Sequence, residues 1–194
     1  HDILSYIAIG ARSVENQQHR LVSSGIDFPV GMKNPTSGDL SVMLNAVHAA
    51  QSSHTFLYRN EEVSTHGNPL THTILRGYVN KHGQSLPNYH YEDLELLADM
   101  YYKRNLMNPF VVVDVNHNNS GKIYSEQPRI VKEVLHSRSM NPTLNSLVRG
   151  VMIESFIVEG NQKPDGGVYG KSITDACIGW DTTEDLLLYM ADHV

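Results

Sequence analysis

The segment from residue 147 to residue 180, LVRGVMIESFIVEGNQKPDGGVYGKSITDACIGW, decides the fold and carries part of the candidate site. Its opening run, Leu147 to Ile153, is mostly apolar and rich in β-branched side chains, which predicts a buried strand. Glu154 follows this strand directly, and Asp175 follows a polar loop and a Gly/Pro-rich turn. Because α/β proteins bind ligands at the carboxyl ends of their strands, we expect both carboxylates near the mouth of a sheet.

Apolar strands and amphipathic helices alternate along the rest of the chain. Further strands are predicted at residues 6–9, 28–32, 54–58, 73–75 and 110–113. Helices are predicted at residues 14–24, 40–47, 91–104, 130–135 and 186–190. We expect Thr182 or Thr183 to cap the last helix, since threonine is a favoured N-cap residue. Such alternation is typical of βα units around a parallel sheet, so the predicted class is α/β.

Composition narrows the classes of function. The 194 residues are 40% hydrophobic and 19% charged, which suits one domain with a sizeable core. A formal charge of −6 and a pI near 6.0 argue against general binding to nucleic acid or membrane surfaces. The sequence has no apolar run of membrane-spanning length and no secretory signal pattern, and Cys177 is its single cysteine. We therefore expect a cytoplasmic protein without an internal disulfide.

Charged or metal-ligating side chains stand just after the predicted strands: Arg12, Lys33, Arg76, His117 and Glu154. Any one of them alone has an ordinary structural explanation, such as a solvated rim residue or a hydrogen-bonded structural histidine. The carboxyl ends of parallel strands, however, meet at one edge of a sheet. Their repeated occurrence at strand ends therefore predicts a common site.

The chemistry of these residues divides into two groups. Arg12, Lys33 and Arg76 form a cationic group suited to a phosphate and a carboxylate, since arginine offers bidentate forks and lysine a point charge. Backbone N–H groups after Gly10 add possible donors to a phosphate. His117, Glu154 and Asp175 offer one imidazole and two carboxylates. That set suits a divalent ion such as Mn²⁺, Fe²⁺, Co²⁺ or Zn²⁺ and leaves coordination positions open.

Five strings of residues in the chain resemble those of the class I 3-deoxy-D-arabino-heptulosonate 7-phosphate (DAHP) synthases. They are IGAR at 9–12, PVGMKN at 29–34, ILRG at 74–77, ES at 154–155 with EGNQ at 159–162, and GKSITDACIGW at 170–180. The resemblance covers nearly the whole chain in the right order. Asn116 departs from the family pattern, which commonly has serine before the histidine, and Tyr78 stands where a second glycine is usual.

The resemblance implies a fold. The family folds as a (β/α)8 barrel, and this chain is similar to its C-terminal part, about strands 4–8. Residues 1–194 are thus expected to form a single partial barrel domain from which the N-terminal strands are absent. The sequence starts at His1 without a methionine, in line with a piece of a larger protein. A homo-oligomer or the missing N-terminal half would then complete the structure.

The resemblance also implies a reaction, the condensation of phosphoenolpyruvate with erythrose 4-phosphate. This is the first step of the shikimate pathway of aromatic amino-acid biosynthesis. Arg12 and Arg76 would hold the phosphate of phosphoenolpyruvate, Lys33 would lie against its carboxylate, and Ala11 would offer a backbone N–H. Lys33 and His117 are the candidate catalytic residues.

His117, Glu154 and Asp175 match three of the four family metal ligands. The fourth ligand is a cysteine on the first barrel strand, which this chain lacks; Cys177 matches a different family cysteine and is not expected to bind the metal. Also absent is the Lys-Pro-Arg-Thr loop that contacts both substrates. The parent protein is therefore expected to be an enzyme, whereas these residues alone would be inactive. The alternative is a catalytically silent remnant that keeps an anion or metal site or acts as an interaction module.

Overall fold

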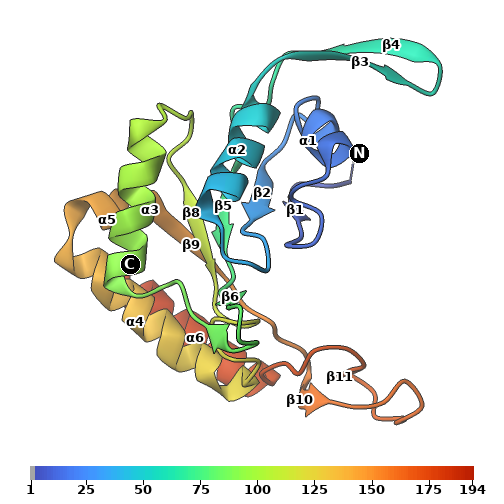
Figure 1. Cartoon of the computed structure of the whole chain (residues 1–194). Coiled ribbons are helices and arrows are strands. Elements are labelled where there is room, and N and C mark those ends of the chain that lie inside the picture. Colours follow the sequence, from blue (N-terminus) through green and yellow to red (C-terminus); the bar gives the residue numbers. More distant parts are fainter. Residues whose placement is uncertain (1–2) are drawn as a thin grey trace.

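The computed structural model describes residues 3–194, so His1 and Asp2 lie outside the description. Its centre is a sheet of parallel strands in the order β1-β2-β5-β8-β9 (Figure 1). The strands span Ile7–Ile9 (β1), Val30–Lys33 (β2), His72–Leu75 (β5), Val111–Asp114 (β8) and Val148–Met152 (β9). Their spatial order follows the order of the chain, with β1 and β9 at the two edges. The predicted α/β class with a parallel sheet is confirmed.

Helices follow or separate these strands. They span Gln17–Ser23 (α1), Leu40–Gln51 (α2), Tyr91–Lys103 (α3), Gln127–Met140 (α4), Pro142–Leu147 (α5) and Trp180–His193 (α6), and a 3₁₀ turn at Tyr124–Glu126 precedes α4. The helix α2 begins at Leu40 because Asp39 caps it, accepting hydrogen bonds from the backbone N–H groups of Ser41 (2.8 Å) and Val42 (3.2 Å). No helix among residues 3–194 is long and apolar enough to cross a membrane.

The hydrophobic core lies between the sheet and its helices. Fully buried side chains from β8 (Val111 and Val113) meet those of α3 (Leu97) and α4 (Val131 and Val134) within one cluster. All residues of β5 and β8 are buried, whereas both edge strands keep partly exposed positions. Burial is thus strongest in the middle of the sheet, and the carboxyl ends of its strands lie beside one another.

Among residues 3–194, three two-stranded units stand outside the sheet. The antiparallel pair His54–Tyr58 (β3) and Glu61–Thr65 (β4) projects at the top of Figure 1. Shorter pairs are formed by Tyr78–Val79 (β6) with Ser85–Leu86 (β7), and by Val158–Asn161 (β10) with Lys171–Ser172 (β11). The predicted strand at 54–58 is therefore present, but it pairs with β4 in a hairpin outside the parallel sheet.

The expected cap of the last helix was wrong. The helix α6 begins at Trp180, and Gly179 occupies the N-cap position. Thr183 lies inside the first turn, where its hydroxyl donates a hydrogen bond to the Gly179 carbonyl at 2.8 Å. The same hydroxyl lies 2.5 Å from the Ser155 Oγ, which ties the start of α6 to the loop that follows β9.

Candidate functional site

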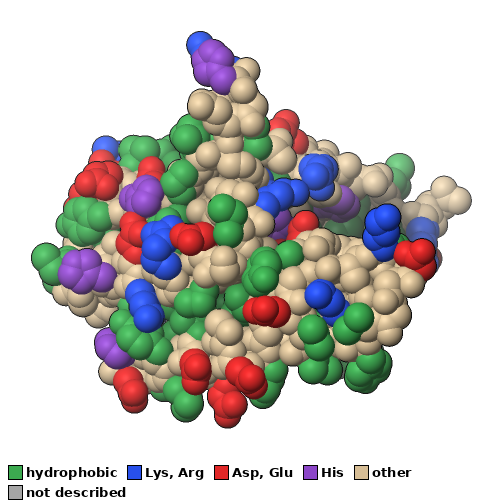
Figure 2. All heavy atoms as spheres, turned by 90° about the horizontal axis from the view of Figure 1, so that it is seen from below, with side chains coloured by type: hydrophobic (Ala, Val, Ile, Leu, Met, Phe, Trp, Pro, Cys, Tyr) green, Lys and Arg blue, Asp and Glu red, His purple; other side chains and the backbone are tan. Residues whose placement is uncertain are grey.

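A cavity of about 330 Å³ opens at the carboxyl ends of the parallel strands. Its walls include most of the predicted site residues: Ala11, Arg12, Lys33, Arg76, His117 and Asp175. Figure 2 views the molecule from this end, where charged and histidine side chains are interspersed with hydrophobic ones. A larger hollow of about 430 Å³ lies elsewhere, beside α3 and α5, and its lining contains no lysine, arginine or histidine. The residues that line the smaller cavity therefore make it the candidate functional site.

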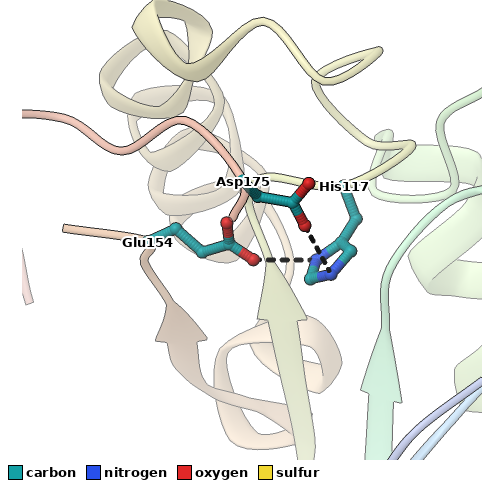
Figure 3. Close-up of side chains that lie close together, drawn as sticks. All are labelled: His117, Glu154 and Asp175. Atoms are coloured by element: carbon teal, nitrogen blue, oxygen red, sulfur yellow. Dashed lines mark ion pairs between the residues drawn. The ribbon is translucent and has the colours of Figure 1, made fainter. Parts of the chain in front are cut away.

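The three predicted metal ligands converge. His117 stands in the loop after β8, Glu154 just after β9, and Asp175 in the loop before α6 (Figure 3). The His117 Nδ1 lies 3.4 Å from Glu154 Oε1, and the His117 Nε2 lies 4.0 Å from Asp175 Oδ2. One ligand atom from each residue lies within 4.8 Å of the others. One imidazole nitrogen and two carboxylate oxygens at this spacing fit a borderline divalent ion.

Neighbouring amides hold Glu154 in place. The Asn116 side chain donates to Glu154 Oε2 at 2.7 Å, and Ser120 Oγ donates to the Asn116 Oδ1 at 2.9 Å. Gln127 binds the Glu154 backbone twice, accepting from its N–H (2.8 Å) and donating to its carbonyl (3.0 Å). Such outer partners orient a metal ligand before the ion binds. Asn116, which stands where the family commonly has serine, thus supports the Glu154 carboxylate and does not disturb it.

Asp114 is a site residue that the sequence analysis did not identify. It is the last residue of β8, and its side chain is fully buried. Its Oδ2 lies 2.7 Å from Lys33 Nζ and 2.8 Å from His117 Nδ1. Among the described residues Nδ1 has no hydrogen-bond partner, so the contact with Asp114 is a close electrostatic one and not an aligned hydrogen bond. An acid that ends a buried apolar run, three residues before a histidine, was the available signal.

The pKa of Asp114 reflects two opposing effects. Burial by itself would raise the pKa of this carboxyl, because it disfavours the charged form. The contacts with the His117 imidazole and the Lys33 ammonium outweigh burial and hold the pKa below its ordinary value. Asp114 is therefore an anion at neutral pH, despite being enclosed.

Arg76 supplies a buried cation to the cavity. It is only 7% exposed, and its guanidinium donates through Nη1 to the Asn118 Oδ1. Burial lowers the pKa of Arg76 more than the nearby carboxylates raise it, yet a guanidinium stays protonated at neutral pH. Among residues 3–194, no carboxylate forms an ion pair with Arg76. A buried guanidinium with donors to spare is a favourable place for an anion.

A chain of buried asparagines connects the strand-end loops. Asn34 donates to the Gly77 carbonyl (3.0 Å), and Gly77 N–H donates to the Asn88 Oδ1 (2.7 Å). The Asn88 N–H donates to Asn119 Oδ1 (2.9 Å), and Asn119 Nδ2 donates to the Asp114 carbonyl (2.8 Å). These bonds fix the backbone on either side of Arg76 and His117. Side-chain amides of this kind are not distinguishable from loop residues in a single sequence.

Comparisons with known proteins identify the family of the chain. The sequence matches the DAHP synthetase I family over residues 1–188. It is 40% identical to the Trp-sensitive phospho-2-dehydro-3-deoxyheptonate aldolase of Enterobacter agglomerans over 201 aligned positions, covering 100% of this chain and 55% of that protein. It is 41% identical to the phospho-2-dehydro-3-deoxyheptonate aldolase of Haemophilus influenzae, covering 100% of this chain and 53% of that protein.

A solved structure shows the same likeness in three dimensions. The phospho-2-dehydro-3-deoxyheptonate aldolase of Francisella tularensis SCHU S4 superposes with a TM-score of 0.88 at 34% identity, over 98% of this chain and 55% of that one. The chain therefore belongs to the DAHP synthetase I family. It spans about half the length of these relatives.

Proposed function

We propose that the cavity is the phosphoenolpyruvate and metal site of a DAHP synthase, which condenses phosphoenolpyruvate with erythrose 4-phosphate in aromatic amino-acid biosynthesis. One observation carries the proposal: the cavity lined by the cationic group of Arg12, Lys33 and Arg76 is also lined by His117 and Asp175, which with Glu154 form the His/Glu/Asp group. The first suits an anionic substrate and the second a divalent ion. The alternative of a silent remnant is not favoured, since both groups are intact.

In this proposal the cationic group binds phosphoenolpyruvate. Arg12 and Arg76 hold its phosphate, the backbone N–H of Ala11 adds a donor, and Lys33 lies against the carboxylate. These groups orient C3 of phosphoenolpyruvate toward the aldehyde of erythrose 4-phosphate and stabilise charge that develops on the phosphate and carboxylate. C3 bonds to the aldehyde carbon, water adds at C2, and phosphate leaves. Lys33 and His117 are the proposed catalytic residues.

His117, Glu154 and Asp175 would hold the divalent ion, which when bound would polarise the aldehyde oxygen as a Lewis acid or position the water. The chemistry of the donors fits Mn²⁺, Fe²⁺, Co²⁺ or Zn²⁺ without selecting among them. Cys177 stays outside the ligand set. Its Sγ donates to the Asp175 carbonyl at 3.5 Å, and burial raises the pKa of its thiol, which disfavours the thiolate that a metal requires.

We further propose that residues 1–194 are a single partial (β/α)8 domain, equivalent to about strands 4–8. All neighbouring strands of the sheet are parallel and follow chain order, as in a barrel. A closed barrel takes about 250 residues, and an open sheet leaves unpaired edges, here on β1 and β9. An N-terminal half or a second chain would supply the missing strands. A cytoplasmic location is proposed with this function.

Calorimetric titration with phosphoenolpyruvate tests the proposed anion site. The charge reversal Arg76→Glu should abolish binding by the full-length protein, because it places a carboxylate where the phosphate would lie. Lys103→Glu is the control: that lysine is exposed and pairs with Asp99 on the surface of α3 at 2.7 Å. Equal effects from the two changes would argue against a specific anion site.

A further inference from the structure

One oxygen of Asp114 contacts a residue from each half of the site. Asp114 Oδ2 lies 2.7 Å from the Lys33 Nζ, at the end of β2, and 2.8 Å from the His117 Nδ1, beyond β8. Lys33 belongs to the cationic group, whereas His117 belongs to the metal group. The second carboxylate oxygen, Oδ1, accepts a hydrogen bond from the Asn116 N–H at 3.1 Å, which fixes the rotation of the carboxylate.

The contact between Asp114 and Lys33 is enclosed by the protein. The Asp114 side chain is 0% exposed and the Lys33 side chain 12% exposed. A buried carboxylate that loses its cationic partner is left as an uncompensated charge, which is strongly unfavourable. Lys33 is therefore held at one position, with its ammonium group on the wall of the cavity.

The two ring nitrogens of His117 face different carboxylates. The Nδ1 lies closer to Asp114 (2.8 Å) than to Glu154 (3.4 Å), and Nε2 is the nitrogen that faces Asp175 (4.0 Å). The negative charge of Asp114 beside Nδ1 favours a proton on that nitrogen over a lone pair, and this leaves the Nε2 lone pair on the side that faces Asp175.

We propose that Asp114 is a positioning residue. Through one shared oxygen it fixes both the Lys33 ammonium and the His117 imidazole, and so fixes the position of the anion-binding half of the site relative to the metal-binding half. The inference rests on the proposed metal and anion site. It adds that the negative charge of Asp114 favours the cation and opposes the anion, so its removal should affect the two ligands in opposite directions.

The test compares Asp114→Asn with wild type in the full-length protein, by calorimetric titration with Mn²⁺ and separately with inorganic phosphate. We expect Mn²⁺ to bind about 10–100-fold more weakly, the usual loss when an outer partner of a metal ligand is removed. Phosphate should bind at least as tightly as before, since Lys33 loses its counter-charge. Asp93→Asn is the control, because Asp93 is a partly buried carboxylate that binds the His90 N–H (3.2 Å) outside the site.

The outcomes separate the inference from the proposed function. Unchanged Mn²⁺ affinity in Asp114→Asn, or a parallel loss of both ligands as from general structural damage, would overturn the role of Asp114. A wild-type protein that binds neither Mn²⁺ nor phosphate would overturn the proposed function, and the inference with it.

A second measurement needs no substitution at Asp114, in case that variant does not fold. The ¹⁵N spectrum of histidine-labelled, metal-free wild type reports which nitrogen of His117 carries a proton, with His117→Gln used to assign the signal. We expect a protonated Nδ1. A ring protonated at Nε2 alone would contradict the inference.

Discussion

His117 and Asp175 belong to loops that follow different strands, yet the imidazole Nε2 and the Asp175 Oδ2 lie 4.0 Å apart. Asp175 is about half exposed and is also 4.0 Å from the Lys122 Nζ, so its position owes little to burial. The pairing depends on the β10–β11 unit and the backbone bonds between Gly160 and Cys177, which bring this loop back over the sheet.

Removal of one carboxylate from the metal group should weaken metal binding. Glu154→Gln and Asp175→Asn each exchange a charged oxygen ligand for a neutral amide of similar shape. We expect each to reduce Mn²⁺ affinity by at least the roughly 10–100-fold that loss of an outer partner costs. Calorimetric titration checks this, with Asp181→Asn on the exposed first turn of α6 as the control. Mn²⁺ affinities equal to wild type in both variants would show that these residues do not bind the metal.

Gly77 should be far less tolerant of a side chain than Gly83. Both have left-handed backbone angles, with φ of +71° and +78°. A Cβ on Gly77 would lie 2.5 Å from backbone atoms of Asn118 and Asn119, whereas one on Gly83 meets nothing within 4 Å. Gly83→Ala should therefore cost only the roughly 1–2 kcal/mol of the left-handed conformation.

Gly77→Ala should cost about 1–3 kcal/mol more in the free energy of unfolding, because the backbone must shift to relieve the overlap. It should also weaken phosphate binding, since Arg76 adjoins the displaced backbone. Urea unfolding of the two variants measures the difference. Equal losses of stability would show that the close approach at Gly77 is readily relieved.

The lowered pKa of Asp114 predicts that the free energy of unfolding depends on pH. A carboxyl whose folded pKa is below its unfolded value stabilises the fold above the unfolded pKa, and that contribution is lost as pH falls through the folded pKa. The metal-free protein should therefore lose stability below about pH 4. Asp114→Asn should show a smaller difference between urea unfolding at pH 7 and at pH 3. An unchanged difference would contradict the assigned shift.

The strand-end residues were predictable because parallel strands place their carboxyl ends at one edge. Arg12, Lys33, Arg76 and His117 needed only an approximate strand boundary to be placed at the same cavity, and the structure brings them there. Their roles in binding and catalysis stay predictions.

Asp114 was not identified because its importance arises from pairing across the sheet. Lys33 and Asp114 end strands that are separated by β5, and no local sequence pattern states that their side chains meet across it. The short helix α5 was not predicted from the sequence either. It consists of PTLNSL, too short for helical periodicity, and it depends on the Asn141 side chain, which accepts from the Thr143 N–H at 2.9 Å.

The partial-barrel proposal predicts that residues 1–194 produced alone have negligible DAHP synthase activity. The cysteine ligand and the Lys-Pro-Arg-Thr loop expected from the resemblance are not supplied by this chain. The check is condensation of phosphoenolpyruvate with erythrose 4-phosphate in the presence of Mn²⁺, on protein of confirmed mass. Turnover near 1 s⁻¹, at the low end of the ordinary enzymatic range of about 1–10³ s⁻¹, would show that the missing half is dispensable.

The same condensation assay on the full-length protein, comparing wild type with Arg76→Gln and Asp175→Asn, tests the central claim most directly. The claim is that one cavity combines an anion site and a metal site for a single reaction. Wild type with Mn²⁺ should turn over at about 1 s⁻¹ or faster, and each variant should lose about 100-fold or more, since removal of one electrostatic contact to a transition state costs about 10²–10³-fold. Full activity in either folded variant, or no turnover by metal-loaded wild type, would contradict the account.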